Sequence, residues 1–454
     1  MAEELFEGFA EHRAPAAGAG GGRPRLREPE RGQIELRALD LDSLIGSDHP
    51  ARLFWVYVER LDLSVLEDRI KARAGRPGHP PISPRLLLAL WLYATSQGVG
   101  SARLLAALCE RDDGYRWLAG GVSVNYHTLS DFRVDHPDLL DRLLVEHVAA
   151  LVAAGVIDLD TLAQDGLRVR AGAGASSFRR RDTVARHLDE ARALVGRLKQ
   201  EVAADAAASQ RRRQAAEARA ARERAARLEA ALTALVGIEA RRAAEAARPR
   251  RRKAAAKAGA KPPKKPKPPR ASTTDVEATV MKMADGGFRP AYNLQIVSVA
   301  ERQIVVAVEP LASGSDGGLM RPMLERVEAA FGRWPERHLA DGGFTKNADI
   351  EWAYEEGRAI AVHCPPIRNR HKTDPFAPRA SDGPGVLAWR RRMASDEGKA
   401  AYRRRGVCEC IHARWRHWNL NRFTVRGRAK VRTVSLWFAL ANNLLQGQRL
   451  IAAA

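Results

Sequence analysis

The chain has 454 residues, with 75 Lys and Arg against 54 Asp and Glu, which gives a formal net charge of +21. This length allows about two to four domains with a sizeable core, and the charge favours a polyanionic partner, either nucleic acid or an anionic membrane surface. No apolar run reaches the roughly 18 residues of a membrane span, and Met1–Ala10 is acidic, unlike a signal peptide. We therefore expect no membrane association and a cytoplasmic DNA or RNA partner.

The N-terminal part is predicted to be helical after a flexible leader. Residues 1–40 are rich in Gly, Ala, Pro and Arg, which is typical of a leader without fixed structure. Residues 41–150 show helical apolar spacing, with helix starts at His49-Pro50, at Ser83-Pro84 and at Ser101. A helix, a Gly-containing turn and a second helix fit a DNA-binding helix-turn-helix, and they fit any small helical bundle equally well.

Residues 151–175 begin a region with strand periodicity. Leu167 and Val169 alternate with Arg168 and Arg170, and the stretches 292–297 and 303–308 are short and β-rich. We predict that these three segments form an antiparallel meander, which opens a domain made of residues 151–175 and 290–454.

An insertion at 176–289 separates the first two strands. Thr183 to Ala247 has a strong helix-forming composition, which predicts one long helix or a helical hairpin. Arg248 to Arg270 has eleven Lys or Arg and six Pro in 23 residues and no acidic residue. Such a segment cannot bury a core, so we expect it to be disordered and to contact phosphates without sequence specificity.

Helices and strands then alternate. The pattern predicts a helix at 319–331, a strand from Arg337 that ends in the acidic turn at Asp341, a helix at 348–356, a strand at 359–362, a loop over 363–396, and helices around Glu409 and over 431–445.

The stretch 402–416 contains an unusual set of functional groups. Tyr402, Arg405, Glu409 and Arg416 lie at offsets of 0, 3, 7 and 14, which share one face of a helix. A carboxylate flanked by a phenol and guanidiniums suits a metal ion beside a phosphate, and a solvated basic helix with an incidental Glu is the plain alternative.

This spacing resembles the third catalytic motif of bacterial insertion-sequence DDE transposases, Tyr-x2-Arg-x3-Glu-x6-Lys, with Arg416 in place of Lys. Gln164-Asp165-Gly166 and the basic strand after it resemble the first motif of the family, and Leu339-Ala-Asp341-Gly-Gly-Phe344 resembles the second. Residues 117–133 resemble the N-terminal helical domain. Residues 273–283 and 292–295 also match family segments, except at Val276 and Thr279, where Pro and Arg are usual.

The resemblance implies an α/β fold: a ribonuclease H-like mixed sheet flanked by helices, preceded by an all-helical DNA-binding domain. It implies a catalytic and metal-binding triad of Asp165, Asp341 and Glu409. The cofactor is then Mg²⁺, with Mn²⁺ as a substitute. Two such ions activate the attacking oxygen and stabilise the leaving one. Tyr402, Arg405 and Arg416 are implied to hold DNA phosphates.

The implied reaction cleaves double-stranded transposon ends and joins their 3′-hydroxyls to target DNA. The implied state is a homodimer on paired ends, associated with the bacterial nucleoid. Two other functions stay open: a catalytically silent, transposase-derived DNA-binding protein, and a metal-dependent nuclease without strand transfer.

Alternative interpretations of individual residues also stay open. Asp158 and Asp160 precede Asp165, although neither is followed by Gly and a basic strand. Tyr402 suits simple packing. Cys408, Cys410 and His412 suggest a zinc cluster, but side chains two positions apart on a helix point about 200° apart, which disfavours it.

Overall fold

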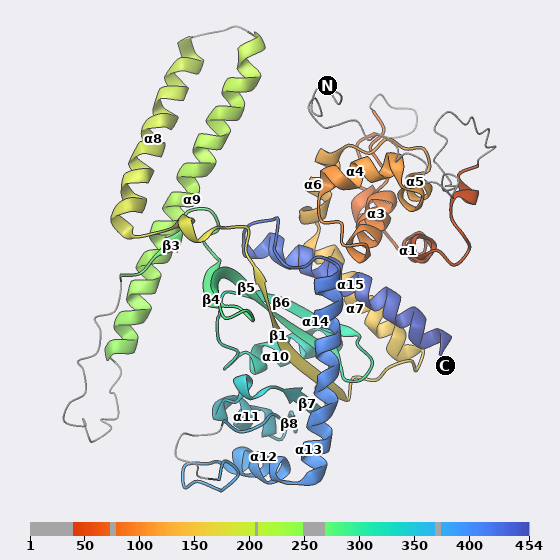
Figure 1. Ribbon diagram of the computed structural model, residues 1–454, viewed down its shortest axis with the longest axis vertical. Helices are drawn as coiled ribbons and strands as arrows, with labels where there is room; N and C mark the ends of the chain where they lie inside the picture. The colour runs from red at the N-terminus through yellow and green to blue at the C-terminus, as the bar shows by residue number, and fades with distance from the viewer. Residues whose placement is uncertain (1–39, 73–78, 205–207, 248–267, 368–373, 454) are drawn as a thin grey trace, which may run out of the picture.

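The structure, a computed structural model, describes residues 40–72, 79–204, 208–247, 268–367 and 374–453 (Figure 1). A helical N-terminal region lies beside a central mixed sheet flanked by helices, and a helical hairpin projects from the sheet. None of the described helices is long and apolar enough to cross a membrane. The predicted leader, up to residue 39, and most of the basic segment, residues 248–267, lie outside the described residues.

The N-terminal region begins with the 3-10 turn η2 (Asp42–Leu44) and contains seven short or medium helices: α1 (Pro50–Glu59), α2 (Ser64–Glu67), α3 (Pro84–Ser96), α4 (Ala102–Arg111), α5 (Asp113–Ala119), α6 (Tyr126–Asp135) and α7 (Pro137–Ala153). His49 and Ser101 cap α1 and α4 with their side chains, as the sequence predicts. Helix α6 begins at Tyr126, where the Asn125 side chain caps it, and α5 was not predicted.

The sheet contains six strands: β1 (Thr161–Arg170), β4 (Thr279–Lys282), β5 (Phe288–Val299), β6 (Val305–Leu311), β7 (Arg337–Ala340) and β8 (Ala361–His363). Strand β5 pairs antiparallel with β1, β4 and β6, whereas β7 pairs parallel with both β1 and β8. The predicted meander is present as β1, β5 and β6. The sheet reaches into the predicted insertion, because β4 and the start of β5 lie before residue 290.

The hairpin consists of α8 (Arg181–Ala204) and α9 (Ala208–Ala247). Its helices pack through a small cluster that includes Val184, Leu188, Leu228 and Leu235. At its base, the 3-10 turn η3 (Ala175–Ser177) leads into β2 (Phe178–Arg179), which pairs antiparallel with β3 (Ala271–Ser272). This pairing separates the hairpin from the main sheet, so the β1–β5 register is uninterrupted.

The remaining elements are helices and 3-10 turns: α10 (Met320–Phe331), η4 (Gly342–Phe344), α11 (Asn347–Tyr354), α12 (Pro384–Ala394), α13 (Asp396–Arg403), η5 (Arg404–Gly406), α14 (Val407–His417) and α15 (Arg428–Ala452). The loop predicted over 363–396 is wrong in its second half, where α12 forms. Pro384 opens that helix, and the Glu351 carboxylate accepts hydrogen bonds from the backbone N–H groups of Gly385 and Val386, a contact that no local pattern reveals.

Helix α15 joins the helical region to the sheet. Fifteen of its residues are buried, and it contacts α3, α6, α7 and β6. Trp437 and Leu440 therefore share one hydrophobic core with Leu90 of α3 and Leu294 of β5. The core spans both regions, and the burial of large apolar side chains on α15 stabilises the contact between them.

Asn443 of α15 fastens the helix to the outer edge of β6. Its side-chain amide donates to the Val305 carbonyl over 2.7 Å, and its oxygen accepts from the Val305 N–H over 2.8 Å. Asn443 is fully buried, so this pair of bonds satisfies a strand edge that water does not reach.

We expect Asn443→Ala to lower the free energy of unfolding by about 2–4 kcal/mol, because it leaves two buried backbone groups without partners. Urea denaturation followed by Trp fluorescence measures the change. Gln448→Ala, at an exposed position of the same helix, is the control and should change stability by less than about 0.5 kcal/mol. Equal effects of the two substitutions would contradict the stabilising role of the Asn443 side chain at the edge of β6.

Candidate active site

Strand pairing places two of the predicted carboxylates side by side. Asp165 lies in the middle of β1, and Asp341 directly follows β7. These two strands are parallel neighbours, with Gln164 opposite Ala340, so Asp165 and Asp341 occupy the next position on each. Adjacent strands are about 4.8 Å apart, which brings the two carboxyl groups into electrostatic contact. Each also accepts a backbone N–H, Asp165 from Gly166 over 2.8 Å and Asp341 from Gly343 over 2.7 Å.

Burial raises the pKa of both carboxyl groups. For Asp165, the Arg405 charge and the Gly166 N–H oppose this increase. For Asp341, the Gly343 N–H opposes it, whereas the charge of Asp165 adds to it. Carboxylates that repel one another in a half-buried place are stabilised by a cation. The arrangement therefore favours a positively charged partner between them.

A third carboxylate, Asp316, was missed by the sequence analysis. Its charge raises the pKa of both Asp165 and Asp341. Its Oδ1 accepts hydrogen bonds from the Asn293 amide over 2.6 Å and from the Gln295 amide over 3.0 Å. The sequence signal was the presence of two amide side chains on one face of the buried strand β5, where a buried amide needs a partner.

Arg405 supplies the cation. Its guanidinium donates to the Asp165 Oδ2 over 3.0 Å and lies 3.6 Å from the Glu409 Oε1. The side chains of Arg405 and Asp165 are only 15% and 16% exposed, whereas that of Glu409 is 70% exposed. The guanidinium also lies 5.8 Å from the centre of the Tyr402 ring. Four of the predicted site residues thus converge, with Arg405 between two carboxylates.

The stretch 402–416 is not one uninterrupted α-helix, although Arg405 contacts both Tyr402 and Glu409, so three of the four predicted residues lie on one side. Helix α13 ends at Arg403, the 3-10 turn η5 covers residues 404–406, and α14 begins at Val407. A 3-10 turn has three residues per turn, so Tyr402 and Glu409 do not follow one α-helical repeat. The turn directs Arg405 inward, and Tyr402 also packs against the hydrophobic cluster that contains Trp389 and Met393.

The zinc alternative is not supported among the described residues. Cys408 is buried beside Ser298, and burial raises its pKa to about 11, whereas Cys410 is exposed. His412 Nδ1 lies 3.9 Å from the Asp165 Oδ2. Burial and the nearby charges of Arg416 and Arg405 lower the His412 pKa to about 4, so this contact involves a neutral imidazole at pH 7.

Arg416 and the two alternative aspartates lie apart from this cluster. Arg416 is exposed in the last turn of α14 and influences the site through its charge on His412. Asp158 accepts the Asp160 N–H, and Asp160 pairs with Arg333 over 2.6 Å, both ahead of β1. Of these three candidate aspartates, only Asp165 lies inside the strand and next to Asp341.

The carboxylates fit a hard divalent cation in chemistry, because oxygen ligands that repel one another suit Mg²⁺. Asp165 and Asp341 are the residues best placed to hold it. Within the described ranges, no three His, Cys, Asp or Glu side chains lie close enough together to hold a metal ion. Glu409 is separated from Asp165 by the Arg405 guanidinium, so a metal contacting all three predicted ligands requires Arg405 to move.

Gly166 is required where these polar groups meet. A Cβ at this position would lie 2.7 Å from both the Asn293 Oδ1 and the Asp316 Oδ1, and 2.9 Å from the Gln295 Nε2. We expect Gly166→Ala to lower the free energy of unfolding by about 1–3 kcal/mol through overpacking. Gly196→Ala, on α8 with open space around it, should instead raise stability by about 0.5–1 kcal/mol. Urea denaturation measures the free energy of unfolding of both variants. An unchanged free energy for Gly166→Ala would contradict the crowding at this position.

Comparison with known families completes the description of the site. Residues 268–444 match the family described as transposase DDE domain, and residues 39–135 match the family described as transposase domain (DUF772). The first match contains Asp341 and Glu409, whereas Asp165 on β1 precedes it. No curated protein and no solved structure matches the chain. Two stretches of the chain are thus similar to transposase domains, which supports an insertion-sequence transposase of the DDE family.

Proposed function

We propose that this protein cleaves the ends of an insertion sequence and joins their 3′-hydroxyls to target DNA, with Asp165, Asp341 and Glu409 as the catalytic carboxylates. The observation that carries the proposal is the parallel register that sets Asp165 beside Asp341. Three antiparallel strands followed by two parallel ones also fit the proposed ribonuclease H-like fold.

Divalent metal ions, Mg²⁺ or Mn²⁺, would activate the attacking oxygen and stabilise the leaving oxygen when bound at these carboxylates. Asp165 and Asp341 provide half-buried ligands, and Glu409 provides an exposed one on α14. Arg405 balances the charge of Asp165 and is placed to contact a phosphate together with Tyr402, whereas Arg416 extends the cationic surface along α14.

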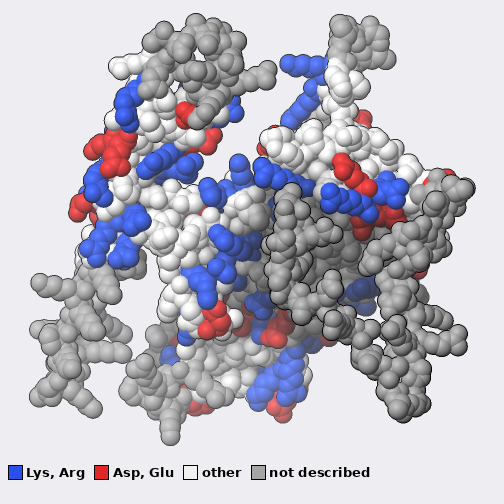
Figure 2. Space-filling view, turned by 45° about the horizontal axis from the view of Figure 1, so that its top comes forward, with Lys and Arg blue, Asp and Glu red and all other residues white. Residues whose placement is uncertain are grey.

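The described surface supports a DNA substrate. Figure 2 shows Lys and Arg side chains predominating between the projecting hairpin and the helical region, with fewer Asp and Glu among them. Cationic side chains attract DNA by releasing the counterions condensed on its phosphates. Transposon-end DNA and target DNA are the proposed partners, held by a homodimer on paired ends in the bacterial cytoplasm near the nucleoid.

One observation favours a second candidate, a catalytically silent DNA-binding protein. Arg405 fills the space between Asp165 and Glu409 that a shared metal ion needs. A protein in which Arg405 never leaves would bind DNA through its basic surface without cutting it.

The metal prediction concerns thermal stability and needs no DNA. Mg²⁺ at about 100 times its Kd should stabilise the wild type by about 2.7 kcal/mol, and its Tm should rise accordingly. Asp165→Asn and Asp341→Asn should each remove this increase, because they delete a ligand. Asp160→Asn, ahead of β1, is the control and should keep it. If Mg²⁺ raised the Tm of Asp341→Asn as much as that of the wild type, the metal would bind elsewhere.

The catalytic prediction concerns strand joining. Pre-cut oligonucleotides that carry the inverted repeats flanking the coding region are incubated with plasmid and Mg²⁺. We expect the wild type to join them, and Asp165→Ala, Asp341→Ala and Glu409→Ala to reduce joining to background while retaining DNA binding. Joining by Glu409→Ala would reject its catalytic role. Binding alone by the wild type would indicate the silent alternative, and cleavage without joining would indicate a nuclease.

A further inference from the structure

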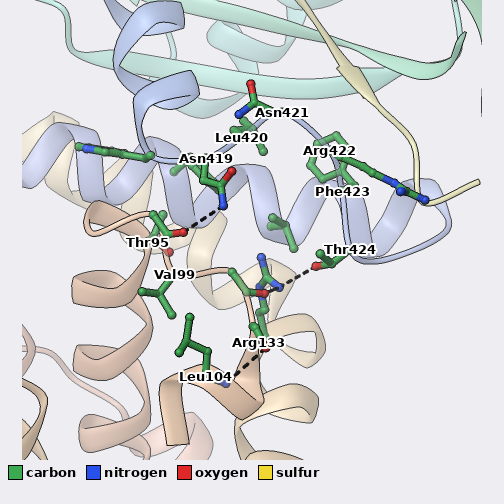
Figure 3. A pocket seen from close by; sticks show the side chains of 16 residues that line it. Thr95, Val99, Leu104, Arg133, Asn419, Leu420, Asn421, Arg422, Phe423 and Thr424 are labelled. Carbon is green, nitrogen blue, oxygen red and sulfur yellow. Dashed lines mark hydrogen bonds between the residues drawn. The ribbon is translucent and has the colours of Figure 1, made fainter. Parts of the chain in front are cut away.

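A cavity lies where the helical region meets the C-terminal part of the chain (Figure 3). It has a volume of about 340 Å³. The turn between α3 and α4 forms one wall, Arg133 of α6 forms a second, and the connector Trp418–Thr424 between α14 and α15 forms the third. Val434 and Phe438 of α15 also line it.

A second hollow, of about 480 Å³, adjoins the first. The two share Gly100, Ser101, Arg133 and Thr424. Arg133 donates a hydrogen bond to the Thr424 hydroxyl over 3.1 Å, which bridges the two hollows (Figure 3). We call the two hollows together the seam.

Cations line the seam in excess. Arg422, Arg426 and Lys430 are exposed along it, and Asp131 is the acidic residue that lines it. Among the residues that the structure describes, the side chains of Arg422 and Lys430 make no hydrogen bond or ion pair, and Arg426 donates only to the Gly172 carbonyl over 3.3 Å. This surface therefore has positive charge that the described protein does not neutralise.

Arg133 lacks a counter-charge although it is half-buried. It donates to the Gly100 carbonyl over 2.5 Å and lies 4.9 Å above the centre of the Trp91 ring. Burial without a carboxylate partner lowers its pKa to about 10. Its bonds explain how Arg133 fastens α6 to the connector. They leave its charge unpaired within the described part of the chain, where an anion from outside would stabilise it.

The connector ties the seam to the strand that carries Asp165. The Arg170 N–H donates to the Asn421 carbonyl over 3.3 Å, and the Phe423 N–H donates to the Arg170 carbonyl over 2.8 Å. Arg170 is five residues beyond Asp165 on β1. At about 3.3 Å per residue, the connector lies roughly 17 Å from Asp165. A DNA strand rises about 3.4 Å per base pair, so this distance spans about five base pairs.

We propose that the seam binds the phosphodiester backbone of the DNA duplex about five base pairs from the phosphate held at Asp165. This proposal rests on the proposed function, because the distance is counted from a phosphate bound at Asp165. Arg422, Arg426 and Lys430 contact successive phosphates, and Arg133 supplies the deepest positive charge. The seam thereby sets the position of the duplex relative to the carboxylates, and it does so without contacting the reacting atoms.

The first test measures the salt dependence of binding to a fluorescein-labelled random-sequence DNA duplex in EDTA, so it requires neither metal nor joining. The slope of log Kobs against log salt concentration is negative, and each lost phosphate contact reduces its magnitude by about 0.9. The Arg422→Ala/Lys430→Ala variant should therefore show a slope that is smaller in magnitude by about 2. Its Tm should match the wild type, because both side chains are exposed and make no bonds to the described protein.

The control is Arg391→Ala/Lys399→Ala, which removes the same charge from α12 and α13, at the opposite end of the molecule from α4 (Figure 1). Its slope should stay at the wild-type value. If both double variants reduce the magnitude of the slope equally, or neither does, the seam does not bind phosphates. This result is independent of whether the protein joins DNA ends.

The second test locates the contact. On a duplex with the flanking inverted repeat, uncharged methylphosphonates replace the phosphates about five base pairs from the cleavage position. They should weaken binding by the wild type and leave binding by Arg422→Ala/Lys430→Ala unchanged, because the contact is already lost. An equal weakening of both proteins would overturn the assigned position.

Discussion

The parallel pairing of β1 with β7 is the constraint on which the rest of this site depends. It sets Asp165 and Asp341 side by side at the same level, where burial raises both pKa values and the charge of Asp165 adds to the increase at Asp341. Positive charge nearby offsets the cost of ionising both acids there. Arg405 provides that charge in this structure, and it belongs to the 3-10 turn η5 between α13 and α14. This turn is therefore part of the site.

The shared core fixes the helical region relative to these carboxylates. Helix α15 packs against α3, α6 and α7 on one side and β6 on another, and Asn443 satisfies the strand edge. The connector ahead of α15 pairs with the end of β1. Under the proposed function, DNA that contacts the helical region is therefore held at a fixed distance from Asp165. A hinged linker between two separate cores would leave that distance variable.

Sequence patterns predicted what depends on local periodicity and chain order. The alternation of Leu167 and Val169 identified β1, and chain order identified the strands that bring Asp165 and Asp341 together. Three features depend on contacts between distant segments, so local patterns did not place them. Asp316 is oriented by amides of β5, α12 is capped by Glu351 of α11, and Arg405 reaches Asp165 across 240 residues. The start of the sheet before residue 290 also depends on contacts between segments, since β4 is defined by its pairing with β5.

The charge distribution links metal binding to DNA binding at the site. The chain carries a net charge of +21, yet Asp165 and Glu409 flank the Arg405 guanidinium, and Asp316, which raises the pKa of both Asp165 and Asp341, lies 3.9 Å from Arg168. A phosphate that approaches these carboxylates is repelled unless a cation intervenes, whereas the seam offers unpaired cations without such an acidic centre. Under the proposed function, DNA can therefore dock along the seam in the absence of metal, and only its scissile phosphate requires a divalent ion. Arg405 then has two successive roles: it neutralises Asp165 before the metal arrives and contacts the phosphate afterwards.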